Sequence, residues 1–357
     1  MTQHKRILFT GGGSAGHVTV NLALIPKLQA QGWDIQYMGS KQGIESQLIH
    51  NLPNVKYHGI STGKLRRYMA LENFKDPFRV IQGVYEAYRL IRNMRPDIVF
   101  SKGGFVYVPV VLGAWLNKVP VIIHESDMTP GLANKIALPF ANKICLTFPE
   151  TLDHIRSAKA IHVGAVIRDE ILQGNAERGR TRVLFDKKLP VLLIMGGSLG
   201  ARKINEAVRK NIRELTKTFQ IVHICGKGQM DAAAEHPRYL QFEYIQEDLA
   251  DVLAMTDIVI TRAGSNSIFE FLALGKSMLL IPLPRASSRG DQILNAESFK
   301  RAGYGELLME EDLTDASFVT KVMTLYDRRE EIAGNMRAYK RNEAVNRVLE
   351  LIGQFSK

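Results

Sequence analysis

Two glycine-rich turns in this sequence suit close contact between the backbone and a ligand. The first, GGGSAGH at residues 11–17, follows a short apolar run, and the second, GGSLGARKIN at residues 196–205, has the same setting. Such a turn between a strand and a helix leaves backbone N–H groups available, and the helix N-terminus adds partial positive charge. One glycine-rich turn is weak evidence, but two in matching positions indicate a phosphorylated ligand.

Two common phosphate-binding motifs do not fit these turns. A P-loop requires lysine before a serine or threonine at the helix start, and neither turn has that lysine. A dinucleotide-binding fold requires an acidic residue at the end of its second strand. The sequence has GSK at residues 39–41 and GK at residues 226–227 in those places. An NAD-dependent enzyme is therefore disfavoured.

A histidine stands where the first turn enters its helix. The positive end of a helix disfavours the imidazolium ion, so we expect His17 to be neutral near pH 7, as a general base must be. The acidic residues of HESD, Glu125 and Asp127, are rival bases. A capping or packing role for His17 is the competing interpretation.

The stretch TRAGSNSIFE, residues 261–270, predicts a strand end and a helix that starts near Ser267, with Glu270 in its first turn. Glu270 then either completes a capping box with Ser267 or accepts hydrogen bonds from a ribose diol. Farther along, three polar side chains surround another predicted helix start, where they would cap the helix or contact sugar hydroxyls. These are Asp291, Gln292 and Asn295.

Elements that could position these residues alternate along the whole chain. The predicted strands are residues 6–10, 33–39, 97–101, 119–125 and 143–148, then 190–195, 220–226, 257–262 and 277–283. Helical patterns fill the gaps, which predicts an α/β fold of two doubly wound, parallel-sheet domains. Ligands bind beyond the carboxyl ends of parallel strands, so we expect a site in a cleft where the two sheets face each other.

The repeat of the glycine turn places the domain boundary. We predict a first domain of residues 1–164 and a second domain of residues 165–341, with the polar, turn-rich residues 164–190 as their connection. A last helical pattern, residues 342–355, could pack on either domain.

Composition excludes several classes of protein. The chain has 357 residues, of which 45% are hydrophobic and 23% charged, and its apolar runs are too short to span a bilayer. Glycines interrupt the N-terminal apolar run too early for an export signal. Cys145 and Cys225 are expected to be buried thiols, as in the cytosol. The net charge of +11 permits nucleic acid, an anionic membrane or phosphorylated ligands.

Six motifs occur in a specific order over nearly the whole chain: GGGSAGH, SKGGFVYVP, HESD, GGSLGARKIN, TRAGSNSIFE and DQILNA. In combination they resemble the bacterial peptidoglycan glycosyltransferase family that adds N-acetylglucosamine to undecaprenyl-pyrophosphoryl-N-acetylmuramyl peptide, converting lipid I to lipid II. The resemblance implies the GT-B fold, an inverting transfer to the 4-hydroxyl, and no need for a metal or cofactor. It also implies that the last helix, within residues 342–357, returns to the first domain.

The same resemblance implies the site residues. The second domain would hold UDP-N-acetylglucosamine through Arg168, Gly197, Ser198, Ile245, Gly264, Glu270, Asp291, Gln292 and Asn295. Of these, Arg168 and Ser198 would contact the diphosphate. The backbone around Ile245 would contact the uracil, Glu270 would bind the ribose, and Gln292 would bind the sugar. The first domain would receive the acceptor and part of the sugar through Gly12, Gly13, Ser14, Gly16, Gly103 and Gly104. His17, Glu125 and Asp127 would be the catalytic candidates.

Four positions depart from the family pattern. Ser14-Ala15 replaces the usual Thr-Gly, Asp127 stands where asparagine is common, and Asp291 precedes Gln292 where two glutamines are common. These changes indicate a subgroup variant rather than another reaction, and they leave the role of Asp127 open.

A lipid acceptor requires contact with a membrane. Basic and apolar residues that suit an anionic leaflet gather at Leu65, Arg66, Arg67, Tyr68, Leu71, Phe74 and Lys75. After them, Asp76 is predicted as a helix N-cap and Pro77 as the first helical residue. The stripe of that helix, formed by Phe78, Ile81, Tyr85 and Tyr88, is predicted to face the core.

The expected location is therefore the cytoplasmic side of the cell membrane, as a peripheral protein. Expected partners are UDP-N-acetylglucosamine, lipid I and the anionic inner leaflet, with other cell-wall synthesis and division proteins as further candidates and no nucleic acid. Two alternatives stay open: another GT-B enzyme, such as a glycolipid transferase or a UDP-sugar epimerase, and a nucleotide-binding regulator. An epimerase needs no lipid, and a regulator does not require His17.

Overall fold

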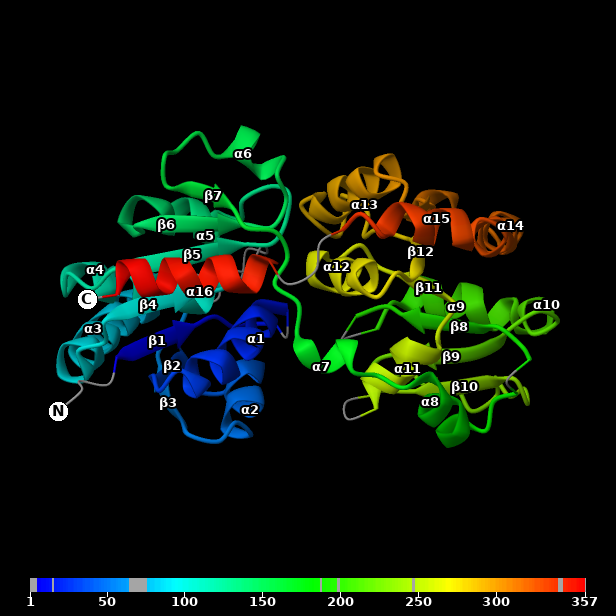
Figure 1. Cartoon of the computed structure of the whole chain (residues 1–357), viewed down its shortest axis with the longest axis horizontal. Coiled ribbons are helices and arrows are strands. Elements are labelled where there is room, and N and C mark those ends of the chain that lie inside the picture. Colours follow the sequence, from blue (N-terminus) through cyan, green and yellow to red (C-terminus); the bar gives the residue numbers. More distant parts are fainter. Residues whose placement is uncertain are drawn as a thin grey trace. The chain divides into compact units, whose positions relative to one another are not determined.

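The chain forms two compact units. The computed structural model describes residues 5–14, 16–63, 76–186, 188–197, 200–245, 248–339 and 343–356. One unit comprises Met1–Arg168 and Asn342–Lys357, and the other comprises Asp169–Arg341 (Figure 1). The boundary that we predicted after residue 164 falls slightly before this division. Arg168, predicted in the second domain, therefore lies in the first unit.

In the first unit, the described strands form one seven-stranded parallel sheet in the order β3-β2-β1-β4-β5-β6-β7. Their bounds are β1 Arg6–Thr10, β2 Asp34–Ser40, β3 Val55–Ile60, β4 Ile98–Ser101, β5 Val121–Glu125, β6 Lys143–Leu146 and β7 Ala160–His162. The order reverses direction between β1 and β4, which is the point where open parallel sheets bind ligands.

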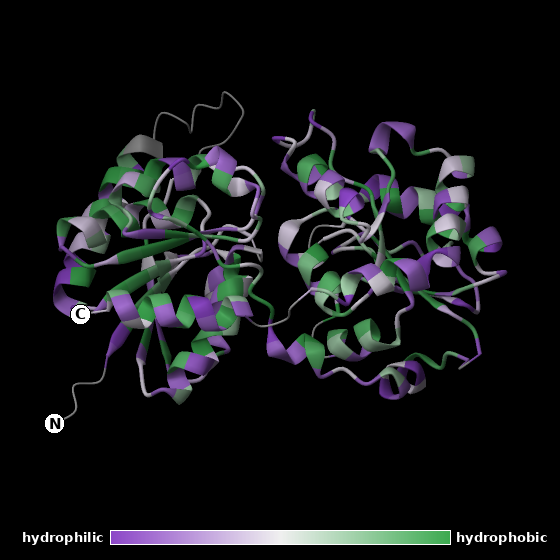
Figure 2. Ribbon diagram, turned by 45° about the horizontal axis from the view of Figure 1, so that its top comes forward, coloured by the Kyte–Doolittle hydropathy of each residue, from purple (hydrophilic) through white to green (hydrophobic). Residues whose placement is uncertain are grey.

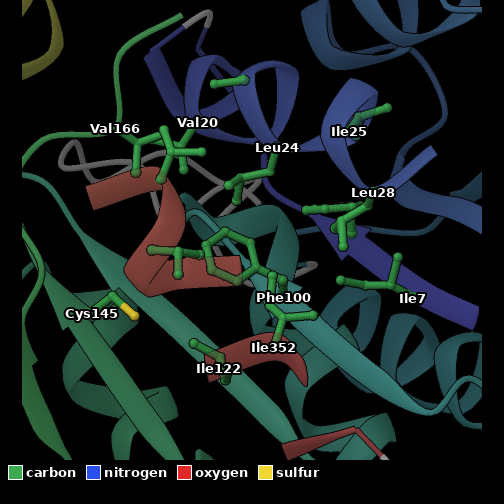
Figure 3. Close-up of a cluster of buried hydrophobic side chains, with 14 of the residues drawn as sticks. Ile7, Val20, Leu24, Ile25, Leu28, Phe100, Ile122, Cys145, Val166 and Ile352 are labelled. Carbon is green, nitrogen blue, oxygen red and sulfur yellow. The ribbon is translucent and has the colours of Figure 1, made fainter. Parts of the chain in front are cut away.

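Helices cover both faces of this sheet. Their bounds are α1 Gly16–Ala30, α2 Ile44–His50, α3 Asp76–Met94, η2 Phe105–Tyr107, α4 Val108–Leu116, α5 Leu132–Ala137, η3 Leu138–Phe140, α6 Thr151–His154 and α16 Glu343–Phe355. One face packs against α1 and α16, where Phe100 and Ile122 of the sheet meet Leu24 and Ile352 (Figure 3). The other face packs against α3, α4 and α5. The last helix of the chain is thus part of the first unit's core.

In the second unit, the described strands form a six-stranded parallel sheet in the order β10-β9-β8-β11-β12-β13. Their bounds are β8 Val191–Met195, β9 Gln220–Ile224, β10 Tyr239–Phe242, β11 Ile258–Thr261, β12 Ser277–Leu280 and β13 Gly305–Leu307. The helices are α7 Asp169–Leu172, α8 Ala176–Val183, α9 Arg202–Lys210, α10 Ile212–Leu215, α11 Leu249–Met255, α12 Ser265–Ala273, α13 Asp291–Arg301, η4 Glu310–Asp312, α14 Asp315–Asp327 and α15 Arg329–Met336. The order reverses between β8 and β11. Strands of both units are mainly hydrophobic (Figure 2).

Every strand predicted from an apolar run is present, and both cysteines are free and buried. The sequence missed β3, β7, β10 and β13, which are the outermost strands of the two sheets. An edge strand is covered by fewer neighbours, so it does not need a continuous apolar run. β3, for example, is only partly buried along most of its length.

The division between the units falls inside residues 164–190, the predicted connection, which also contains α7 and α8. These helices pack against α11, and Arg178 pairs with Asp251 there. The prediction for the next connecting segment was wrong. The helix after the basic segment begins at Asp76 itself, and its apolar stripe is not in the core. Phe78, Ile81 and Tyr85 are 75%, 67% and 60% exposed. That helix packs through its small residues instead: Ala87 is buried, and no side chain separates Gly83 from the Ser61 carbonyl.

The place of α16 in the core predicts that its apolar face stabilises the first unit. Ile352 is fully buried, so Ile352→Ala should lower the free energy of unfolding of this unit by about 2–5 kcal/mol. Urea unfolding followed by circular dichroism measures the change. Gln354→Ala, on the exposed side of the same helix, is the control and should shift stability by less than about 0.5 kcal/mol. Equal effects of the two variants would contradict the packing of α16.

Candidate functional site

The candidate residues of the first unit lie on loops that follow three neighbouring strands. Residues 11–14 follow β1, residues 102–104 follow β4, and residues 126–131 follow β5. In a parallel sheet these loops share the carboxyl edge, and β1 and β4 flank the point where the strand order reverses. The structure therefore brings the predicted acceptor and catalytic residues of this unit to one edge of the sheet.

His17 is held by the loop that precedes it. Its Nδ1 lies 3.0 Å from the Gly12 carbonyl oxygen and 3.1 Å from the Ser14 hydroxyl. A carbonyl oxygen can only accept, so Nδ1 carries the proton of this hydrogen bond. In the neutral ring, Nε2 then carries the lone pair. The backbone thus sets the tautomer that a general base working through Nε2 needs.

The loop after β4 approaches this histidine without a side chain between them. A Cβ atom on Gly104 would lie 2.2 Å from the Gly12 carbonyl oxygen and 3.0 Å from Nδ1 of His17. Gly104 also has a φ of 88°, which favours glycine, and the N–H of Gly12 donates to the Gly103 carbonyl at 3.3 Å. Gly103 and Gly104 therefore act first as packing partners of the loop that holds His17.

A buried carboxylate behind the first glycine turn was missed by the sequence analysis. Glu45, in the first turn of α2, is fully buried and accepts the N–H of Gly13 at 3.1 Å and the N–H of Ser40 at 3.0 Å. The N–H groups of Gly12 and Gly13 are thus used inside the protein. Our expectation that glycines of this turn offer their N–H groups to a diphosphate is wrong for these two residues. The sequence did contain a signal for this carboxylate. Glu45 lies shortly after β2, close to the place where a dinucleotide-binding fold has its acidic residue.

Glu125 plays a similar part in the loop after β5. Its Oε1 accepts the N–H of Asp127 at 3.0 Å, and its Oε2 accepts the N–H of Gly131 at 2.8 Å and the Asn134 amide at 2.9 Å. Burial, followed by the nearby charge of Asp127, raises the pKa of Glu125, while these donors oppose the rise. The carboxylate is therefore occupied in shaping its own loop.

The amine of Lys102 is buried beside Glu125 and Asp127. Lys102 is 3% exposed, and its Nζ donates to the Ser126 hydroxyl. Burial lowers the pKa of Lys102, and the charges of Glu125 and Asp127 oppose that change. Asp127 itself is only partly buried. A cation thus stands behind the carboxylate that replaces the family's usual asparagine.

In the second unit, the glycine turn follows β8, and Ser198 lies outside the described residues. Gly200 has a φ of 76°, and a Cβ there would lie 2.0 Å from the Cys225 carbonyl oxygen. Asn205 of α9 donates to that carbonyl at 3.0 Å and lies 2.9 Å from Nε2 of His223. Burial lowers the pKa of His223 to about 3, so the ring is neutral. This network of buried polar groups fixes the end of β9 under the turn.

The helix near Glu270 starts earlier than the sequence indicated. α12 begins at Ser265 after Gly264, and no side-chain hydrogen bond caps it. Ser267 is therefore inside the helix, Glu270 is in its second turn, and the capping-box interpretation is excluded. Glu270 is 8% exposed. The Thr261 hydroxyl donates to the Met195 carbonyl at 2.8 Å, which joins the ends of β11 and β8.

The helix start predicted near Asp291, Gln292 and Asn295 is confirmed, since α13 begins at Asp291, and these polar residues have internal partners. Asp291 forms an ion pair with Arg289 at 2.7 Å, and the side-chain Oε1 of Gln292 accepts the N–H of Leu283 at 3.0 Å. Asn295 is fully buried and donates to the Ala263 carbonyl at 3.1 Å. Asn295 thus supports the loop before α12 from inside the protein.

The remaining predicted residues are placed individually. Gly13 and Ser14 are exposed, Gly16 is partly buried at the start of α1, Gly197 has open space around its Cα, and Ile245 is partly buried. Arg168 is partly buried at the end of the first unit, and its role toward a diphosphate stays a prediction. The basic segment that carries Leu65, Arg66, Arg67, Tyr68, Leu71, Phe74 and Lys75 lies outside the described residues.

Two family models match the two halves of the chain. The N-terminal domain of glycosyltransferase family 28 matches residues 7–146, and the C-terminal domain of the same family matches residues 191–350. The first match contains all three loops at the edge of the first sheet. The second contains the glycine turn after β8 and the starts of α12 and α13.

Curated relatives match over the full length. A protein of Geobacillus thermodenitrificans is 58% identical over 98% of both chains, and its name is UDP-N-acetylglucosamine--N-acetylmuramyl-(pentapeptide) pyrophosphoryl-undecaprenol N-acetylglucosamine transferase. A protein of Bacillus cereus with the same name, numbered 2, is 55% identical over 98% of this chain and 99% of its own. Among solved structures, MurG of Acinetobacter baumannii has a TM-score of 0.77 at 24% identity, over 99% of this chain and 100% of that one. At this identity, the similarity to the solved structure shows the fold alone.

The packing at Gly104 predicts that a methyl group there disturbs His17. Gly104→Ala would push against the Gly12 carbonyl, which should break the hydrogen bond to Nδ1 and change the tautomer balance of the ring. Long-range proton–nitrogen correlation spectra of the two ring nitrogens measure this, and the original chain should show a protonated Nδ1. Gly353→Ala, where a Cβ would meet nothing within 4 Å, is the control. An unchanged His17 spectrum in Gly104→Ala would contradict this account.

Proposed function

The chain belongs to glycosyltransferase family 28, and we propose that it transfers N-acetylglucosamine from UDP-N-acetylglucosamine to the 4-hydroxyl of N-acetylmuramic acid in lipid I, making lipid II. The observation that carries this proposal is 58% identity over 98% of the chain to a relative named for that reaction. Two parallel-sheet units with a glycine turn at the carboxyl edge of each agree with it. The reaction requires a proton acceptor and a site for a leaving diphosphate.

His17 supplies the proton acceptor in this proposal. With the proton of Nδ1 directed to the Gly12 carbonyl, Nε2 takes the proton of the attacking hydroxyl. The acceptor oxygen then forms a bond to the anomeric carbon, and the bond from that carbon to the diphosphate breaks. The electron pair leaves with UDP. Glu125 is a weaker candidate for the base, because two backbone N–H groups of its own loop and the Asn134 amide of α5 already donate to it.

The second unit binds the nucleotide in this proposal. Three loops follow the adjacent strands β8, β11 and β12, so Gly197, Gly264 and the start of α13 share one edge. Available N–H groups of a glycine turn favour a diphosphate. Glu270 would accept the ribose hydroxyls, a role that the loss of the capping-box interpretation supports. Asn295 acts as a support of this site rather than as a sugar ligand, because it is fully buried.

Turnover with and without acceptor tests the function and the base together. UDP release from UDP-N-acetylglucosamine should require a lipid I analogue. His17→Ala should lower turnover by roughly 10²–10⁴-fold and leave UDP affinity unchanged, because the nucleotide binds the other unit. His50→Ala, which removes an exposed histidine at the end of α2 in the same unit, is the control and should leave turnover within about twofold. A fall of less than tenfold in His17→Ala would make Asp127 the base to test, and UDP release without acceptor would contradict the transferase.

We also propose that the first unit contacts an anionic membrane surface through α3 and α4. These adjacent helices expose Phe78, Ile81 and Tyr85 on α3, and Trp115 and Leu116 at the end of α4. Exposed aromatic and aliphatic side chains of this size are unusual on a protein surface that faces only water. A basic residue lies beside them: the guanidinium of Arg89 is 5.8 Å from the centre of the Tyr85 ring. Among the described helices, none combines the length and apolar character needed to cross a bilayer.

Removal of the apolar stripe of α3 tests this contact. Replacing Phe78, Ile81 and Tyr85 together by serine should weaken binding to phosphatidylglycerol vesicles by at least about tenfold, because apolar area no longer leaves water. Vesicle sedimentation measures the change. Leu184→Ser with Met230→Ser, which removes two exposed apolar side chains of the second unit, is the matched control. Vesicle binding that falls equally in both variants would exclude α3 as the contact.

A further inference from the structure

A buried carboxylate lies at the carboxyl edge of the second unit's sheet. Glu310 is the first residue of η4, shortly after β13, and is 8% exposed. Its Oε2 lies 2.5 Å from Nη2 of Arg262, which is equally buried, and its Oε1 lies 3.3 Å from Nζ of Lys203. None of these three residues has been given a role above. Glu310 is thus the shared counter-charge of two cations that come from distant parts of the chain.

Arg262 connects the ends of three neighbouring strands. It directly follows β11, and its Nη1 donates to the carbonyl oxygens of Ile281 at 3.0 Å and Pro282 at 3.2 Å, which follow β12. Its Nη2 faces Glu310, which follows β13. Both terminal nitrogens of the guanidinium therefore have partners inside the protein. This arrangement suits a cross-link between strand ends better than a ligand of a diphosphate, which would need the same donors.

Lys203 extends this cross-link to the glycine turn after β8. It lies in the first turn of α9, the helix that follows the glycine turn, and that first turn contains no acidic residue. The positive end of a helix disfavours a lysine there. Glu310 supplies the missing negative charge from another part of the chain. The pair thereby ties the start of α9 to the ends of β11, β12 and β13, which follow β8 in the order of the sheet.

The segments joined in this way carry the proposed nucleotide ligands. Gly197 belongs to the turn before α9, and only Ala263 and Gly264 separate Arg262 from α12, which carries Glu270. A shift of either helix start would move a ligand group away from the nucleotide. Two cations and one carboxylate also leave one positive charge beside the turn, which favours an approaching diphosphate.

We infer that Glu310 is a positioning residue of the nucleotide site. Through its ion pairs with Arg262 and Lys203, it holds the starts of α9 and α12 in the arrangement that receives the diphosphate and the ribose. Without this carboxylate, the buried guanidinium would keep only carbonyl partners, and its charge would favour a turn toward water. The residues that precede α12 would move with it. The inference rests on the proposed function for the identity of the nucleotide.

The second unit offers a close control for Glu310. Glu306 of β13 is 6% exposed and also pairs with two cations, Lys321 at 3.1 Å and Arg328 at 2.5 Å. These partners lie on α14 and directly after it, and neither belongs to a loop that follows β8, β11 or β12. Loss of either carboxylate should therefore reduce stability, but only loss of Glu310 should affect the nucleotide.

The test variant is Glu310→Gln and its control is Glu306→Gln, both in the full chain. Isothermal titration calorimetry with UDP should give a Kd roughly ten- to hundredfold higher in Glu310→Gln, because hydrogen bonds to the charged ligand weaken. The Kd of Glu306→Gln should stay within about twofold of the original chain. The KM for UDP-N-acetylglucosamine should rise with the Kd, whereas the KM for a lipid I analogue should not change, because the acceptor binds the first unit. An equal Kd in both variants would overturn the inference.

A double-mutant cycle separates positioning through Arg262 from a direct role of Glu310. Arg262→Gln alone should also raise the Kd for UDP. The double variant should raise it no further than the more affected single variant, because both changes break the same pair. Effects that multiply in the double variant would show that the two residues act independently, and they would contradict the inference.

Two further outcomes keep the inference separate from folding and from the proposed function. Glu310→Asp keeps the buried charge on a shorter side chain, so it should fold even where Glu310→Gln does not, and it should raise the Kd for UDP severalfold. An unchanged Kd in Glu310→Asp, with Glu310→Gln unfolded, would overturn the inference. Should the original chain bind UDP, and Glu310→Gln bind it weakly, yet no sugar be transferred to the lipid I analogue, the proposed function would fall and the positioning role would stand.

Discussion

The hydrogen bond between the Gly12 carbonyl and Nδ1 of His17 is the interaction on which the first unit's site depends. It is accompanied by close packing on both sides of the turn: a Cβ atom on Gly104 would lie 2.2 Å from the Gly12 carbonyl oxygen, and a Cβ atom on Gly12 would lie 2.3 Å from the Glu45 carboxyl carbon. The glycines that suggested phosphate binding are thus needed for packing between loops. The result is an imidazole whose orientation is fixed by backbone atoms, and backbone atoms move little when surface side chains change.

Buried carboxylates give these loops their shape. Glu45 accepts backbone N–H groups of Gly13 and Ser40, and Glu125 accepts those of Asp127 and Gly131. A loop without regular structure must satisfy its polar backbone groups by some partner, and an ionised acceptor forms the stronger bonds. The same charges make the inner side of this edge acidic.

Apolar runs, glycine turns and motif order were sufficient to predict both sheets, the nine inner strands and the family. They could not predict the outer strands, because a strand with one neighbour has no uniform apolar signature. The stripe of Phe78, Ile81 and Tyr85 was wrongly predicted to face the core for a similar reason. Helical spacing shows that side chains share one face of a helix, but it does not show what covers that face. Glu45 was missed, and the role of Asn295 was left open, for a different reason: polar residues near a turn can face a ligand or support the loop from inside, and only burial distinguishes the two.

The two units use one supporting arrangement with a single important difference. In each, the helix after the glycine turn carries a buried asparagine that donates to a strand-end carbonyl: Asn21 to Thr10, and Asn205 to Cys225. Each asparagine also meets a ring on the second strand of its half, Tyr37 or His223. Only the first turn has a carboxylate behind it, because among the described residues no acidic group accepts from Gly196, Gly197 or Gly200. Electrostatics therefore favours a diphosphate at the second turn and neutral hydroxyl groups at the first. In the proposed function, this difference would let one repeated scaffold hold the nucleotide in one half and the attacking sugar in the other.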